Sequence, residues 1–224
     1  MSFDDIKWLA ESKRIQCAID VGTTQAPRAG REHYLGMSGL GGCAAEQWHN
    51  YHIADAHGVG IDPPLQRIFD LGNTLEDVVI GYLNAGGVTP VSVQAEYTDF
   101  DGRLRGHSDF VYDTPDGHRI VMDVKSMNDR NYQWLAKTGV KNAQWKYYCQ
   151  LMMYARYEQA DAVQLIAYNK NDSRMLVQTM GYDETTADML RARAQMILDA
   201  PSKPPCEKGN GRVKWCNCKQ TTKP

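Results

Sequence analysis

Residues 107–125 read HSDFVYDTPDGHRIVMDVK, and no other stretch of the chain specifies its own structure so closely. Apolar and polar residues alternate through 107–112 and again through 119–125, and this period of two is typical of a half-buried strand. Between these segments, DTPDG at 113–117 is typical of a tight turn, because proline and glycine supply the required backbone angles. The stretch therefore predicts a β-hairpin.

The second strand of this hairpin carries charged residues on one face. Asp123 and Lys125 share that face with Val121, because side chains alternate along a strand. A turn centred near 115–116 sets Asp109 opposite Asp123, with Cβ atoms about 5 Å apart. Two carboxylates so close repel each other unless a cation lies between them or one is protonated. The pair suits Mg²⁺ or Mn²⁺ with a lysine nearby for water or phosphate, but a charged pair on a solvated face explains the pattern equally well.

The rest of the pattern predicts a mixed α/β protein, in which helices flank a central sheet of mixed strand direction. Residues 21–42 are glycine-rich and predict a loop. The expected helices are residues 1–20, 43–56, 73–83, 142–159 and 184–198. The expected further strands are residues 88–93, 95–100, 162–168 and 175–180.

The composition excludes several classes of protein. Of the 224 residues, 42% are hydrophobic and 23% are charged, which is typical of a globular chain and not of a disordered one. No run of about eighteen apolar residues could span a membrane. The first residues, MSFDD, lack the apolar segment of a secretory signal, and six cysteines are too few for a disulfide scaffold. We therefore expect a cytoplasmic protein with reduced thiols and no membrane partner.

The charge distribution is uneven. A net charge of −2 argues against a general nucleic-acid-binding domain, which is usually strongly basic. Acids dominate residues 46–123, whereas cations dominate from residue 125 onward and in the tail. A metal-assisted phosphodiester enzyme needs both, since acids hold the metal and cations hold phosphates. Solvated surface charge is the alternative.

Two further polar features lie outside the hairpin. Gln150 and Tyr154 are one turn apart on an otherwise apolar expected helix, so they either line a polar site or pack with partial exposure. Glu76 follows Asn73 by three residues, which is the pattern of a capping box at a helix start. A functional role for Glu76 is the other interpretation.

Taken in order, these motifs resemble those of the PD-(D/E)XK nuclease superfamily. Within it, the chain is similar to RecB-like exonucleases, including CRISPR-associated and phage-encoded members. The resemblance runs from about residue 38 to the C-terminus and implies a restriction-endonuclease-like core. The matching positions are Glu76, Asp109 in GHSD, Asp123-Val124-Lys125, and Gln150 with Tyr154.

The resemblance implies a role for each of these residues. Glu76, Asp109, Asp123 and the Val124 carbonyl would ligate Mg²⁺ or Mn²⁺. Lys125 would orient or activate the attacking water, and Gln150 and Tyr154 would support the lysine and the DNA end. The chain departs from the family pattern twice, because many relatives have histidine at Glu76 and glutamate at Asp123. Both changes keep an oxygen ligand for a hard cation.

Aromatic and cationic residues are interleaved between the motif at 123–125 and the motif at 150–154. Bases stack on aromatic rings and cations follow phosphates, so this segment predicts a DNA-binding surface. Core aromatics with solvated lysines are the alternative. The candidate contacts are Arg130, Trp134, Lys137, Lys141 and Lys146. The other aromatic residues in the segment are Tyr132, Trp145, Tyr147 and Tyr148.

Cysteines gather in the tail, as Cys206, Cys216 and Cys218, and Cys43 lies far upstream. Some RecB-like nucleases hold an iron–sulfur cluster with one upstream cysteine and three near the C-terminus, which this arrangement resembles. Four thiolates fit either a [4Fe–4S] cluster or Zn²⁺. The spacing departs from the family, which normally shows two cysteines separated by two residues. Unliganded thiols in the tail are the alternative.

We therefore expect an N-terminal helix and loop at 1–42, a nuclease core at 43–200, and a basic, cysteine-containing tail at 201–224 that packs near Cys43. The expected function is metal-dependent DNA exonuclease activity on linear ends, in phage or mobile-element recombination or repair. A recombination partner protein or a second copy of the chain is the expected protein partner. A structure-specific endonuclease, a non-catalytic DNA-binding or assembly module, and a metal-binding adaptor are the alternatives.

Overall fold

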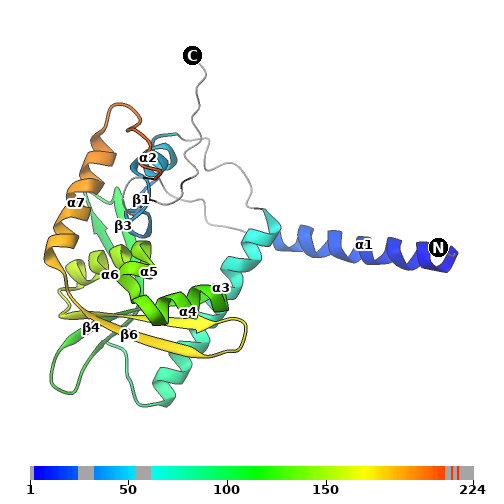
Figure 1. The fold of residues 1–224 in the computed structure, drawn as a ribbon, viewed down its shortest axis with the longest axis horizontal. Helices are drawn as coiled ribbons and strands as arrows, with labels where there is room; N and C mark the ends of the chain where they lie inside the picture. The colour runs from blue at the N-terminus through cyan, green and yellow to red at the C-terminus, as the bar shows by residue number, and fades with distance from the viewer. Residues whose placement is uncertain (1–2, 25–32, 54–61, 210–212, 214–215, 217–224) are drawn as a thin grey trace.

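The computed structural model describes residues 3–24, 33–53, 62–209, 213 and 216. Helices pack on both faces of a central sheet, and one helix extends away from the rest (Figure 1). The helices are α1 (Phe3–Thr24), η1 (Met37–Gly39, a 3₁₀ turn), α2 (Ala44–His52), α3 (Pro63–Ala85), α4 (Asp129–Thr138), α5 (Val140–Ala143), α6 (Trp145–Glu158) and α7 (Glu184–Asp199). The strands are β1 (Leu35–Gly36), β2 (Ser92–Asp99), β3 (Leu104–Asp113), β4 (Arg119–Met127), β5 (Ala162–Asn169) and β6 (Met175–Gly181).

The sheet is mixed, as the sequence predicts. β3 is antiparallel to both β2 and β4, β4 is parallel to β5, and β5 is antiparallel to β6. The short strand β1 is parallel to β3. The central strands are β3 and β4, which form the predicted hairpin, so the sheet is built around residues 107–125.

β3 and β4 separate halfway along the hairpin. They pair from Asp113 opposite Arg119 to Phe110 opposite Met122. Beyond that pair, β4 stays beside β5, while β3 pairs through Leu104 with β1. We call the point where the strands part the fork. The next residues along the two strands are Asp109 and Asp123, so both lie at the fork.

Two hydrophobic clusters cover the two faces of the sheet. The larger cluster packs β-sheet residues such as Val121 against α6 and α7. The smaller one packs Phe110, Met122 and Val124 against α3. The predicted alternation along β4 is therefore confirmed, and Asp123 lies on the face that α6 covers.

Several expected elements are confirmed by the structure, namely the hairpin, β5, β6, α6 and α7. The expected strands at 88–93 and 95–100 form one strand, β2, and residues 88–91 lie outside it. The helix expected at 43–56 ends at His52, and residues 54–56 lie outside the described part of the chain.

Two expectations are wrong, and one helix was not expected. α3 begins at Pro63, so Asn73 and Glu76 lie inside the helix and do not form a capping box at its start. The expected loop at 21–42 is partly regular, because α1 continues to Thr24 and β1 and η1 form at 35–39; residues 25–32 lie outside the described part. The helix α4 was not expected at all.

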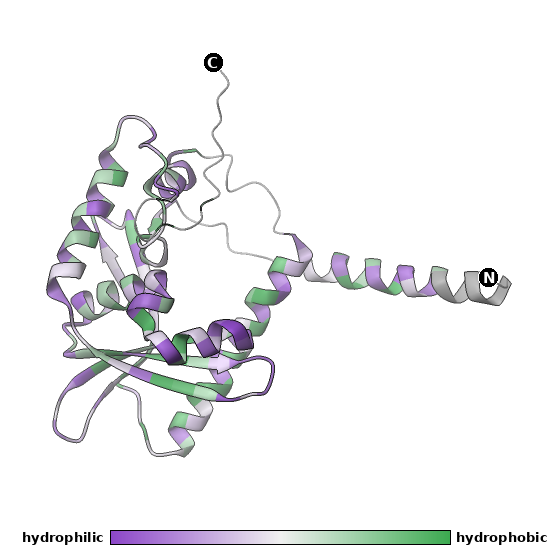
Figure 2. Ribbon diagram, viewed as in Figure 1, coloured by the Kyte–Doolittle hydropathy of each residue, from purple (hydrophilic) through white to green (hydrophobic). Residues whose placement is uncertain are grey.

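The helix α1 projects from the body and contacts α3 (Figure 1). Hydrophilic and hydrophobic residues are mixed along its described length without one apolar face (Figure 2). Arg67 of α3 forms an ion pair with Asp20 of α1 at 2.7 Å. None of the helices in the described segments is both long enough and apolar enough to cross a lipid bilayer.

Candidate active site

Asp109 and Asp123 are buried at the fork. Asp109 is 7% exposed and Asp123 is 0% exposed. The backbone N–H of Val124 donates to Asp109 Oδ2 at 2.7 Å. The Val124 N–H lies beyond the last residue pair of β3 and β4. The Asp109 carboxylate therefore accepts the hydrogen bond that a backbone carbonyl of β3 would otherwise accept. The interpretation of these two acids as a charged pair on a solvated face is therefore wrong.

Lys125 reaches back to the same acids. Its Nζ lies 2.6 Å from Asp123 Oδ2 and 3.4 Å from the Val124 carbonyl oxygen. Burial opposes the ammonium charge, but the fields of Asp123 and Asp109 outweigh it and raise the pKa of Lys125. The Lys125 side chain as a whole remains 24% exposed.

Helix α6 supplies the polar residues that support Asp123. Gln150 Nε2 donates to Asp123 Oδ1 at 3.0 Å and to the Tyr154 hydroxyl at 2.8 Å. Gln150 and Tyr154 are both buried, so the interpretation as partly exposed packing is wrong. Gly106 of β3 makes room for Tyr154, because a Cβ atom there would lie 2.6 Å from its ring.

Glu76 approaches from α3. Gln94 Nε2 of β2 donates to Glu76 Oε1, and Glu76 is half-buried. Burial raises the pKa of the Glu76 carboxyl, Lys125 opposes that rise, and Asp123 adds to it. The structure therefore brings Glu76 into the electrostatic field of the fork from a helix on the other side of the sheet.

Together the carboxylates carry more negative charge than Lys125 can balance. Burial and the neighbouring Asp123 raise the pKa of Asp109 to about 8. Burial also raises the pKa of Asp123, against the effect of Lys125. Apart from its close contact with Lys125 Nζ, the buried Asp123 Oδ2 meets no hydrogen-bond donor among the described residues. Carboxylate and carbonyl oxygens are the ligands that Mg²⁺ and Mn²⁺ prefer, so the donor chemistry suits a hard divalent cation, although oxygens of Glu76, Asp109 and Asp123 do not all lie within 4.8 Å of one another.

Sequence reasoning did not place Tyr147 or Gln94 at this site. The ring of Tyr147 lies beside Lys125, with Nζ 5.8 Å from the ring centroid. Tyr147 precedes Gln150 by three residues, so helical spacing alone could have placed it on the same face. Gln94, which donates to Glu76, has a φ angle of 53°. A strand-like sequence does not predict this left-handed backbone conformation.

Of the four predicted cysteine ligands, three lie in the described segments, and these three come together. The sulfur atoms of Cys43, Cys206 and Cys216 lie within 4.8 Å of one another, and we call this group the cysteine cluster. The backbone N–H of Glu207 donates to Cys43 Sγ and that of Lys208 donates to Cys206 Sγ, each at 3.4 Å. Cys218 lies outside the described residues.

Helix α7 connects the tail to the region around Cys43. Arg193 donates to the carbonyl oxygens of Leu40 and Gly42, at 3.1 and 2.7 Å, and forms an ion pair with Glu207. Glu207 also accepts the backbone N–H of Ala44 at 2.8 Å. One arginine side chain thus joins the loop before Cys43 to the loop after Cys206.

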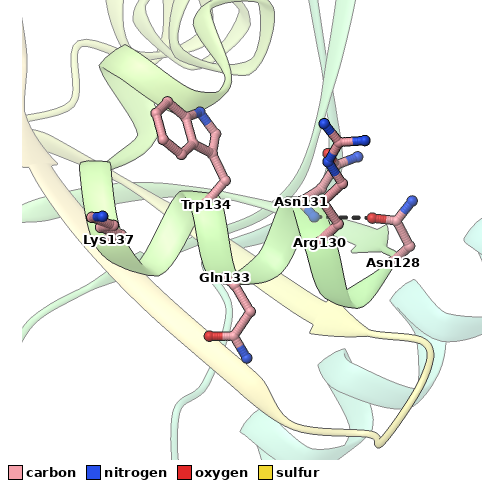
Figure 3. A pocket seen from close by; sticks show the side chains of 6 residues that line it. All are labelled: Asn128, Arg130, Asn131, Gln133, Trp134 and Lys137. Carbon is pink, nitrogen blue, oxygen red and sulfur yellow. Dashed lines mark hydrogen bonds between the residues drawn. The ribbon is translucent and has the colours of Figure 1, made fainter.

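The five candidate DNA contacts do not form one surface. Arg130, Trp134 and Lys137 line a pocket of about 650 Å³ on α4 (Figure 3). Lys141 instead forms an ion pair with Asp183 at 3.1 Å. Lys146 lies against the loop at Gly42, where a Cβ atom would be 3.2 Å from its Cε.

Comparisons with known proteins agree with this geometry. A family model described as the PD-(D/E)XK nuclease superfamily matches residues 48–220. No curated protein matches the sequence.

Solved structures resemble the fold at low sequence identity. An alkaline exonuclease from Laribacter hongkongensis gives a TM-score of 0.58 at 12% identity, over 75% of this chain and 87% of that one. A structure of that exonuclease in complex with dAMP gives 0.50 at 16% identity, over 81% and 84%. A phage-related exonuclease from Haemophilus somnus 129PT gives 0.50 at 14% identity, over 69% and 77%. The similarity to these three structures concerns the fold.

Proposed function

Because the chain belongs to the PD-(D/E)XK nuclease superfamily, we propose that it is a divalent-metal-dependent deoxyribonuclease that degrades linear DNA from its ends. The buried acids at the fork carry this proposal. Asp109 and Asp123 lie side by side with Lys125 as their nearest cation, which is a costly arrangement for a binding module. In a nuclease the same two carboxylates would hold a cation, which would offset the free-energy cost of burying them.

Glu76, Asp109, Asp123 and the Val124 carbonyl oxygen would hold Mg²⁺ or Mn²⁺. When bound, such a cation neutralises phosphate charge and favours ionisation of a water. The chain positions its own ligands: Gln150 fixes one oxygen of Asp123, and Tyr154 fixes Gln150. The second Asp123 oxygen is also buried and lies 2.6 Å from Lys125 Nζ.

Lys125 is suited to orient the attacking water. An ammonium group has three N–H donors. Asp123 and the Val124 carbonyl account for two directions, which leaves one donor for a water or a phosphate oxygen. Asp123 and Asp109 raise the pKa of Lys125 in the metal-free protein, which favours an ammonium group that would orient the water by donating a hydrogen bond. Hydrolysis would form a bond between the water oxygen and phosphorus and break the P–O bond to the leaving nucleotide, while the water gives up a proton to solvent and the leaving oxygen takes one from solvent.

The preference for DNA ends is supported by the names of the structural neighbours, which are exonucleases, one of them phage-related and one bound to dAMP. We extend the proposal to phage or mobile-element recombination or repair on the same basis. A structure-specific endonuclease on this core is the main alternative.

A digestion experiment tests the proposal. End-labelled linear DNA and closed circular DNA of the same sequence are incubated with wild-type protein in Mg²⁺, Mn²⁺ or chelator. We expect loss of linear DNA only, abolished by chelator and by Asp123→Asn. The exposed acid Asp113, which pairs with Arg119 at the turn end of β3, provides the matched control Asp113→Asn. Cleavage of circles would favour the endonuclease, and no cleavage by folded, metal-loaded protein would contradict the nuclease proposal.

We also propose that Cys43, Cys206 and Cys216, with Cys218 as the fourth ligand, bind a [4Fe–4S] cluster or Zn²⁺. The clustering of three sulfurs and the N–H groups directed at two of them support this. The group would join the start of α2 to the C-terminal tail and take no part in the chemistry. Iron, sulfide and zinc analysis of anaerobically purified protein distinguishes the two, and protein without any of them would contradict the proposal.

A further inference from the structure

Helix α4 is amphipathic, and its outer side carries an unusual set of residues. Tyr132 and Leu135 are buried against the body of the protein, which leaves Arg130, Trp134 and Lys137 exposed. We call these three the outer face of α4. Figure 3 shows the Trp134 ring and the Arg130 side chain on the same side of the helix, with Gln133 on the opposite side in that view.

Among the described residues, the cations of the outer face have no anionic partner. No ion pair or side-chain hydrogen bond in the described segments involves Arg130 or Lys137. Other cations nearby are neutralised: Lys141 pairs with Asp183, and Arg174 pairs with Asp129 on the inner side of α4. In a chain whose net charge is −2, an exposed helix face with two unpaired cations is a local attraction for anions.

Trp134 lies between these cations with 47% of its surface exposed. A single exposed aromatic ring is ordinary on a protein surface. Here the ring borders a pocket of about 650 Å³ whose other lining groups are polar, including Asn128 and Asn131 (Figure 3). A helix rises about 1.5 Å per residue, so Arg130 lies about 6 Å before Trp134 along the axis and Lys137 about 4.5 Å after it. A planar ring between two cations matches a base between two phosphates.

The start of α4 follows the fork closely along the chain. β4 carries Asp123 and Lys125, and α4 begins at Asp129 after a cap at Asn128. From Lys125 to Asn128 an extended chain spans at most about 10 Å. A DNA strand bound at the fork would therefore reach the start of α4 within a few nucleotides.

We propose that the outer face of α4 is a subsite for an unpaired DNA strand, with a base stacked on Trp134 and phosphates at Arg130 and Lys137. This inference rests on the proposed nuclease function, since it places the subsite beside the same site. Duplex bases are stacked on one another and closed to a side chain, so the ring selects a single strand over a duplex.

Binding without cleavage tests the subsite. The probes are a fluorescein-labelled, mixed-sequence single strand and a blunt duplex of the same length, titrated with the full chain in chelator and followed by anisotropy. We expect Trp134→Ala to weaken single-strand binding about tenfold and duplex binding less than about twofold. Trp134→Phe keeps an aromatic ring and should retain most of the affinity. Tyr82→Ala, which removes an exposed aromatic residue from α3, is the matched control.

The salt dependence tests the two cations. Arg130→Gln and Lys137→Gln should each lower the slope of log K against log salt by about 0.7, because each loses one phosphate contact. Equal losses on single strand and duplex, or a Trp134→Phe variant as weak as Trp134→Ala, would overturn the subsite. Cleavage is measured separately: protein that cleaves DNA while Trp134→Ala binds normally refutes the subsite alone. Trp134-dependent binding without cleavage refutes the nuclease proposal alone.

Discussion

The fork and the cysteine cluster both gather residues that are far apart in the sequence, but they are supported in different ways. At the fork, Asp123 is fixed by Gln150 from a regular helix, and Asp109 by the backbone of the neighbouring strand. In the cysteine cluster, Cys43 precedes α2 while Cys206 and Cys216 belong to an irregular tail. The two acids proposed for catalysis are thus fixed by regular elements of the sheet and of α6. The three cysteines are fixed by contacts with one another and with loops. Variants in the two regions should therefore fail differently.

The largest effect is expected from Asp109→Asn. The amide oxygen can still accept the Val124 N–H, so the fold should remain, while one charged metal ligand is lost. We expect cleavage of linear DNA to fall by about 10³-fold or more, with unchanged circular dichroism. Asp113→Asn serves again as the control on the same strand. An Asp109→Asn variant that cleaves within about tenfold of wild type would remove Asp109 from the metal site.

Cys43→Ser should act on stability instead. If a metal group joins Cys43 to the tail, its loss should destabilise the protein by about 3 kcal/mol or more, which is about 6–12 °C in Tm for a chain of this size. The matched control is Cys149→Ser, which also places a hydroxyl at a buried cysteine but outside the cluster. Equal losses in the two variants would show that no metal contributes at Cys43.

This contrast also shows how far the sequence predicts the molecule. Alternation and the DTPDG turn were sufficient for the hairpin and its register, and hence for the placement of Asp109 and Asp123. The cap at Asn128 and the glycine at Gly139, where φ is 76°, are local signals for α4 that we overlooked. The contact of Gln94 with Glu76 is different, because it depends on a positive φ and on how α3 crosses the sheet. Such tertiary contacts leave no periodic trace in the sequence.

A divalent cation should stabilise the fork in a pH-dependent way. Asp109 has a pKa of about 8 in the folded, metal-free protein, against about 4 in an unfolded chain. Between these values the folded state holds the extra proton, so stability falls as the pH rises. A cation replaces that proton, and Mn²⁺ at about 100 times its Kd should raise Tm by about 5–10 °C near pH 8 and by less near pH 5.

Differential scanning calorimetry at both pH values checks this expectation. The Asp109→Asn variant, which lacks the titrating carboxyl, should show a flatter pH dependence and a smaller gain from Mn²⁺. A rise in Tm with Mn²⁺ as large as that of wild type would mean that the cation binds elsewhere, for example at the cysteine cluster. The fork would then not be the metal-binding region of the two.

The smallest effect is expected at Tyr147. A ring beside an ammonium group contributes about 0.5–2 kcal/mol, so Tyr147→Leu should lower cleavage about twofold to thirtyfold through the position of Lys125. Tyr147→Phe keeps the ring and should stay within about twofold of wild type. Single-turnover rates of the two variants check this, and a Phe variant as slow as Leu would assign the role to the hydroxyl instead.

The bond between Trp48 and the carbonyl of Ala200, two residues 152 positions apart, has a consequence for how the protein is made. A ribosome releases residue 48 long before it adds residue 200, so α2 and its neighbouring loop must wait for most of the chain before they meet their partners. Contacts of such high sequence separation slow folding. The hairpin at 107–125 is local and can form while synthesis continues. The sheet would then form first. The contacts between the region of α2 and the tail would form last, after Cys216 has emerged.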